Sequence, residues 1–119
     1  MKKLILNGAG NIAKATAIRL AEMGWQVFAL DEDIQKATDL LAALPKDARG
    51  AAMQIDPLDE QSIIAAVEKA GGADALLNSA LTIERKPAKH IKAGEMEALF
   101  AKNVAPMFYC ARACAAYMK

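Results

Sequence analysis

Four short apolar runs alternate with four segments of helical periodicity, and this alternation limits the possible folds more than any other feature. The runs are Leu4–Leu6, Val27–Leu30, Ala51–Ile55 and Ala75–Leu77, and the helical segments are Ala13–Met23, Ile34–Leu44, Ile63–Ala70 and Glu95–Met118. Because the runs are too apolar for a sheet with one face in water, they predict a parallel sheet with helices on both faces. Right-handed crossovers favour the strand order 3-2-1-4. We therefore predict an α/β fold with about four strands.

Length and composition bound the class of protein. The chain has 119 residues, 55% hydrophobic and 24% charged, which predicts one globular domain over residues 1–119. A net charge of +1 gives no electrostatic case for nucleic acid as a partner, and no apolar run approaches the roughly 20 residues of a membrane span. Two cysteines are too few for a disulfide framework, and the short run after Met1 is unlike a signal peptide. We expect a cytoplasmic protein.

A glycine-rich turn follows the first apolar run directly. Gly8-Ala9-Gly10-Asn11-Ile12-Ala13 has the pattern G-x-G-x-x-A between a predicted strand and a predicted helix. The first glycine permits a tight turn, the second lets the backbone approach a pyrophosphate, and the small third residue lets helix and strand pack closely. The helix start favours an anion. This pattern predicts a Rossmann-like dinucleotide site that includes Gly8, Gly10, Asn11 and Ile12. The alternative is a structural turn without a ligand.

Acidic residues follow the second and third apolar runs. Asp31 stands 23 residues after Gly8, where a carboxylate can accept hydrogen bonds from both adenosine ribose hydroxyls and would repel a 2′-phosphate. This predicts NAD over NADP, and the alternative is a strand-end or helix-capping role beside Asp33. Asp56 could face the adenine edge or serve as a helix-start residue, and the sequence leaves both possibilities open.

These positions resemble the short-chain dehydrogenase/reductase family, and the resemblance extends from Lys3 to Lys119. Asn7–Ala13 is similar to a shortened form of that family's Thr-Gly-x-x-x-Gly-x-Gly turn, without its later glycines. Asp31 is similar to the acidic residue of NAD-preferring members. Asp56–Asp59 resembles the family's Asp-Val-x-Asp segment, whose first residue contacts adenine.

Two later segments carry the same resemblance. Asn78-Ser79-Ala80 is similar to the family's Asn-Asn-Ala-Gly segment, with Ser79 in place of the second Asn and Leu81 in place of the Gly. The resemblance assigns these three residues to the cofactor site. Asn103 is similar to the asparagine of the family's fourth helix, which supports the catalytic lysine through a water.

The resemblance implies the NAD-binding portion of an oxidoreductase that acts on CH–OH donors. In that family the catalytic Ser and the Tyr-x-x-x-Lys pair lie on the next strand and helix. Tyr109 has Ala113 four residues later, and Tyr117 has only two residues after it. We therefore expect a chain truncated before the catalytic residues and inactive alone. The alternatives are a regulatory nucleotide-sensing domain, similar to those of potassium channels, and a methyltransferase-like nucleoside site.

Truncation would leave apolar surface without a partner. In the resembled fold a fifth strand flanks the fourth, and a further helix packs on the last one, so the edge at Ala75–Leu77 and part of the stripe Met107–Tyr117 would be uncovered. This predicts a homodimer or higher oligomer through the last helix and fourth strand. No metal site is expected, because His90 reads as a solvated loop residue and Cys110 and Cys114 as buried thiols.

Overall fold

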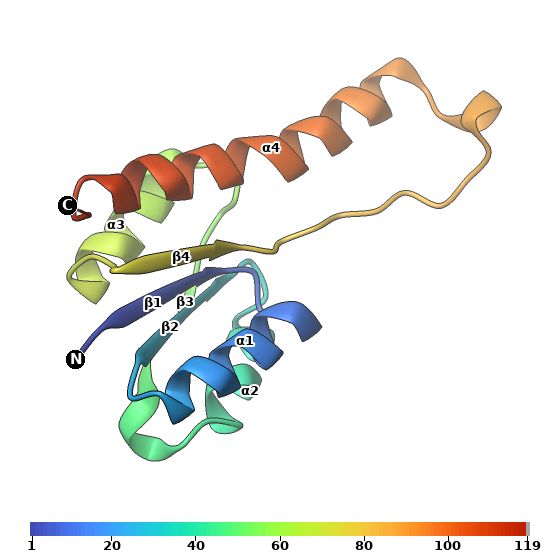
Figure 1. The fold of residues 1–119 in the computed structure, drawn as a ribbon. Helices are drawn as coiled ribbons and strands as arrows, with labels where there is room; N and C mark the ends of the chain where they lie inside the picture. The colour runs from blue at the N-terminus through green and yellow to red at the C-terminus, as the bar shows by residue number, and fades with distance from the viewer. Residues whose placement is uncertain (119) are drawn as a thin grey trace.

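Strands and helices alternate along the whole computed structural model (Figure 1), which describes residues 1–118. Lys119, the last residue of the predicted domain, lies outside the described residues. The strands are β1 (Lys3–Asn7), β2 (Gln26–Asp31), β3 (Arg49–Gln54) and β4 (Ala75–Asn78). The helices are α1 (Asn11–Glu22), α2 (Ile34–Ala42), α3 (Glu60–Ala70) and α4 (Ala93–Ala115), with short 3-10 turns η1 (Lys46–Ala48) and η2 (Ala88–His90).

The four strands form one parallel sheet in the order β3-β2-β1-β4, which confirms the predicted topology. The central strand β1 pairs with both β2 and β4, and its Ile5 lies opposite Phe28 and Leu76. Strand β4 is at the edge of the sheet, and all four of its residues are only half-buried.

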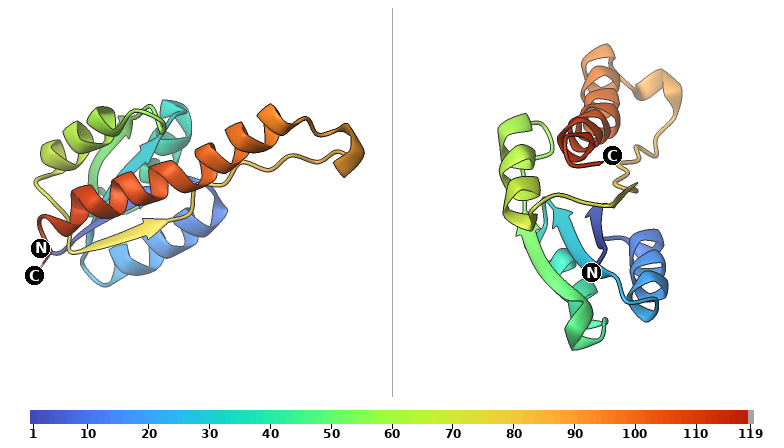
Figure 2. Two further views of the ribbon diagram at one scale, coloured as in Figure 1. Left: turned by 90° about the horizontal axis from the view of Figure 1, so that it is seen from above. Right: turned by 60° about the vertical axis from the view of Figure 1, so that its left-hand side comes forward.

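Helices cover both faces of the sheet, as Figure 2 shows in its right-hand view. Successive residues of a strand point to opposite faces. Leu4 and Leu6 of β1 therefore pack with buried residues of α1 and α2, among them Ala17 and Leu40. Ile5 packs on the other face in a cluster with buried residues of α3 and α4. Small alanines on α1 let this helix approach the sheet closely.

A capping side chain sets the start of α3, and the bounds of α4 differ from the prediction. Asp59 caps α3 as predicted, because its side chain accepts a hydrogen bond from the N–H of Gln61 at 3.1 Å. Helix α4 begins at Ala93 and ends at Ala115, whereas we predicted it over Glu95–Met118.

The two cysteines of α4 are buried thiols, as predicted. Cys110 and Cys114 are fully buried and make no disulfide, and they belong to the core cluster between α4 and the sheet. Burial raises the pKa of Cys110 to about 12 and that of Cys114 to about 11, so both remain protonated near neutral pH.

The N-terminal half of α4 and the loop before it extend past the sheet (Figure 1), and the molecule measures 49 × 28 × 21 Å. Within residues 1–118 no helix combines the length and apolar character that crossing a membrane requires. This half of α4 brings side chains to the carboxyl ends of β1, β2 and β4.

Candidate functional site

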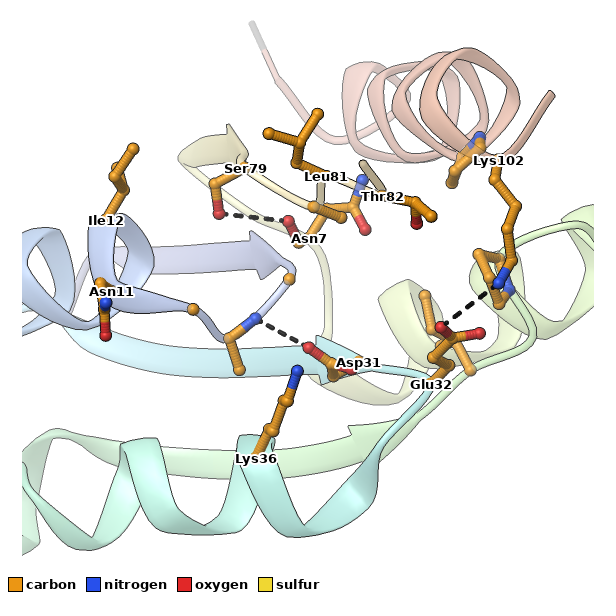
Figure 3. A pocket seen from close by; sticks show the side chains of 17 residues that line it. Asn7, Asn11, Ile12, Asp31, Glu32, Lys36, Ser79, Leu81, Thr82 and Lys102 are labelled. Atoms are coloured by element: carbon orange, nitrogen blue, oxygen red, sulfur yellow. Dashed lines mark hydrogen bonds and ion pairs between the residues drawn. The ribbon is translucent and has the colours of Figure 1, made fainter. Parts of the chain in front are cut away.

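A cavity of about 480 Å³ lies at the carboxyl ends of β1, β2 and β4 (Figure 3). Open parallel sheets bind ligands at this edge, beside the point where the strand order reverses. Five segments line the cavity: Asn7–Ile12 after β1, Asp31, Glu32 and Lys36 around the start of α2, Ile55 and Pro57 after β3, Ser79–Thr82 after β4, and Lys102 and Pro106 of α4.

Gly8 turns the chain at the end of β1 under two constraints that only glycine meets. Its φ is +100°, and a Cβ at this position would lie 2.7 Å from the backbone nitrogen of Ala80. Backbone hydrogen bonds join the turn to both neighbouring strand ends. The N–H of Gly8 donates to the oxygen of Leu30 in β2, and the N–H of Ala80, just after β4, donates to the oxygen of Asn7. The glycine turn therefore holds the ends of β1, β2 and β4 together.

Gly10 stands at the start of α1 and faces open space. It occupies the N-cap position without a side-chain hydrogen bond, and a Cβ added there would meet no atom within 4 Å. The first N–H groups of a helix have no partner within the helix. The end of α1 can therefore receive an anionic group in the space above Gly10.

Asp31 lies against the glycine turn. One carboxylate oxygen accepts a hydrogen bond from the N–H of Ala9 at 2.9 Å, and the other accepts one from the N–H of Asp33 at 2.9 Å. Helix α2 has its own cap, since Asp33 accepts from the N–H of Gln35. Asp31 is thus a cavity residue that also braces the turn.

Three predicted site residues, Asp56, Asn78 and Asn103, are outside the lining of the cavity. The Asp56 carboxylate accepts a hydrogen bond from the N–H of Leu58 at 3.0 Å, an arrangement typical of the helix-start alternative. The oxygen of the Asn78 side chain accepts from the Asn7 amide, and its nitrogen donates to the oxygen of Met107. A contact of Asp56 or Asn78 with a cofactor stays a prediction.

Asn103 instead holds the wall of the cavity in place. Its side-chain oxygen accepts from the N–H of Thr82 at 2.9 Å, and its nitrogen donates to the oxygens of Thr82 and Leu99. These bonds tie α4 to the segment after β4. Asn103 is therefore a positioning residue in this structure.

The other predicted residues all line the cavity: Gly8, Gly10, Asn11, Ile12, Asp31, Ser79 and Ala80. The sequence interpretation missed the charged lining residues Glu32, Lys36 and Lys102. Lys36 is the third residue of α2, and the first turn of a helix after a strand borders this edge of the sheet. The position of Lys36 in the first turn of this helix could therefore have identified it as a lining residue from the sequence. His90 is exposed in η2 and is outside the lining of the cavity.

Comparisons with known proteins agree with this arrangement. The family model described as short chain dehydrogenase matches residues 2–119. A short-chain dehydrogenase/reductase from Serratia marcescens superimposes with a TM-score of 0.81 at 22% identity, over 98% of this chain and 50% of that one. A 3-ketoacyl-(acyl-carrier-protein) reductase from Brucella melitensis, solved with NADH, superimposes with a TM-score of 0.78 at 24% identity, over 92% and 46%.

The chain therefore spans about half the length of these two structures. No curated protein matches it in sequence. The structural likeness establishes the Rossmann-like fold. Because the family model covers nearly every residue, the chain belongs to the short-chain dehydrogenase family.

Proposed function

We propose that these 119 residues form the NAD-binding portion of an oxidoreductase. The observation that carries the proposal is the cavity itself, which places the Gly8–Ile12 turn, the open helix start at Gly10 and the Asp31 carboxylate on one surface. Family membership supports a nicotinamide dinucleotide as the ligand, and it favours this function over a regulatory nucleotide-sensing domain.

Each part of the dinucleotide has residues suited to it. The N–H groups that begin α1 would hold the pyrophosphate above Gly10. Asp31 would accept hydrogen bonds from the adenosine ribose, because each carboxylate oxygen has a second lone pair beyond its backbone bond. Ile55 and Pro57 would flank the adenine. A bound nicotinamide would supply hydride transfer. It would lie beside Ser79–Thr82, which line the cavity after β4.

NAD is the proposed form because Asp31, which lines the cavity, would face the adenosine ribose. A carboxylate there repels a 2′-phosphate and accepts bonds from a free 2′-hydroxyl. We also propose that the 119-residue polypeptide does not catalyse hydride transfer alone. A tyrosine acid at neutral pH needs a nearby group that lowers its pKa, and Tyr109 has Ala113 at the position of the family's lysine.

Titration with NADH tests the proposed function. Saturable enhancement of nicotinamide fluorescence, with heat of binding in calorimetry, is the expected result. The same samples assayed with NAD and a panel of alcohols should give no turnover. Absence of saturation at millimolar NADH would reject cofactor binding, and NAD-dependent alcohol oxidation by the purified chain would reject the predicted inactivity.

We further propose that the chain self-associates through α4 and β4. Large apolar side chains of α4 are exposed, including Phe100 at 68% and Met96 at 61%, and β4 is an edge strand. Sedimentation velocity should show a dimer or larger species that Phe100→Glu shifts toward monomer. A wild-type chain that stays monomeric at high concentration would contradict this proposal.

A further inference from the structure

An ion pair spans the cavity between two of its walls. The Lys102 ammonium of α4 lies 3.8 Å from the carboxylate of Glu32, the residue after β2 (Figure 3), and both residues line the cavity. Within residues 1–118 no other ion pair or side-chain hydrogen bond joins α4 to the connection between β2 and α2. The polar link between these two walls, in that part of the chain, therefore consists of one pair of side chains.

The backbone at each end of the pair is held in place, while the charged side chains are open to solvent. The side-chain nitrogen of Gln54 donates to the backbone oxygen of Glu32 at 3.0 Å. Beside Lys102, the Asn103 side chain binds both backbone groups of Thr82. The side chains of Lys102 and Glu32 are 40% and 56% exposed. Because exposed ion pairs contribute little stability, this one can break and re-form while α4 and the sheet keep their positions.

The ion pair stands at the adenosine end of the proposed site. Glu32 directly follows Asp31, the residue proposed to bind the ribose. Ile55 and Pro57, which would flank the adenine, line the same cavity. A dinucleotide bound as proposed would therefore have its adenosine beside the pair, and its pyrophosphate and nicotinamide further along the cavity.

We propose that the Glu32–Lys102 ion pair gates the adenosine end of the cavity. The dinucleotide enters and leaves while the pair is broken, and the pair re-forms in both the free and the occupied cavity. This inference rests on the proposed function, because it concerns the entry of the same ligand. When only a fraction of the molecules is competent to exchange ligand, the observed rates scale with that fraction. Loss of the pair should therefore speed both association and dissociation, with little change in the dissociation constant.

Stopped-flow fluorescence of NADH with the 119-residue chain measures both rate constants. Lys102→Met and Glu32→Gln should each raise both rate constants by about two- to fivefold, the range that the strength of an exposed ion pair allows. Exchange of the charges, by Glu32→Lys together with Lys102→Glu, should restore the pair and return both rate constants to wild-type values. The matched control is Arg19→Gln, which breaks an exposed ion pair with Glu22 on α1 outside the cavity and should alter neither rate constant.

Electrostatic attraction of the ligand without gating predicts a different pattern. Lys102→Met removes a cation and would weaken binding of the anionic dinucleotide, whereas Glu32→Gln removes an anion and would strengthen it. Such opposite changes in the dissociation constant, unchanged rate constants in both variants, or no restoration by the charge exchange would overturn the gate and leave NADH binding intact. Failure of the proposed function looks different, since wild type would then not bind NADH, and the gate would fail with it.

Discussion

Gly8 and Gly24 share a backbone conformation but have different surroundings. Their φ angles are +100° and +87°, a region that residues with a Cβ rarely adopt. A Cβ on Gly24 would meet nothing within 4 Å, whereas one on Gly8 would collide with the backbone of Ala80. The comparison separates the cost of the conformation from the cost of the close approach.

Alanine substitutions at these two glycines should destabilise the protein to different extents. Gly24→Ala should lower the free energy of unfolding by about 1–2 kcal/mol, the cost of a left-handed conformation for a residue with a Cβ. Gly8→Ala should lower it by at least about 1 kcal/mol more, because Ala80 must also move. Urea denaturation measures both values. Equal losses would contradict the structural role assigned to the Gly8–Ala80 contact.

Residues of the site were predictable where a local backbone pattern defines them. Gly8 and Gly10 follow from a strand–turn–helix pattern that needs no knowledge of the rest of the chain. Lys102 reaches the cavity from a helix about 70 residues further along, and only tertiary packing places it beside Glu32. For Asp56 the sequence left an adenine contact and a helix-start role open, and the structure adds a local hydrogen bond from the N–H of Leu58 to one carboxylate oxygen.

At the level of elements, hydrogen bonds from two asparagines join α4 to β4 and to the segment after it. Asn78 of β4 reaches the oxygen of Met107, and Asn103 binds both backbone groups of Thr82. Thr82 lines the cavity, so the position of α4 and the shape of the cavity are linked. This link gives Asn103 a role that does not depend on a catalytic lysine.

Asn103→Ala should loosen the segment after β4. The substitution removes three hydrogen bonds, and we expect the free energy of unfolding to fall by about 1–3 kcal/mol. Hydrogen exchange followed by mass spectrometry should show faster exchange around Thr82 and unchanged protection in β1. Unaltered exchange at Thr82 would contradict the positioning role. Asn11→Ala, an exposed residue of α1 with no such bonds, is the control for helix substitution.

Helix and strand identities were predictable because hydrophobic periodicity reflects burial on the two faces of the sheet. The ends of helices and strands depend on tertiary packing, which hydrophobic periodicity does not report. Strand β3 begins at Arg49 and includes Gly50, a poor signal for a strand, because pairing with β2 extends it and Phe28 fills the space beside Gly50. Tertiary contact outweighs local preference at this end.

At the level of the whole molecule, a long helix reaches past the sheet (Figure 1). The chain matches about half the length of similar solved structures, and its longest dimension of 49 Å includes the extended part of α4 and its loop. The exposed face of α4 and the edge of β4 are distinct from the cavity. Cofactor binding and self-association are therefore separable by mutation, and Phe100→Glu should leave NADH binding unchanged.

Calorimetric titration of NADH into wild type, Gly10→Val and Gly94→Val tests most directly whether the cavity above the glycine turn binds the dinucleotide. Both glycines have open space around them, but Gly94 lies outside the cavity, at the second position of α4. We predict one site per chain in wild type and Gly94→Val, and at least tenfold weaker binding in Gly10→Val, whose side chain fills the space for the pyrophosphate. Equal affinity in all three proteins, or no binding by wild type, would contradict the proposed site.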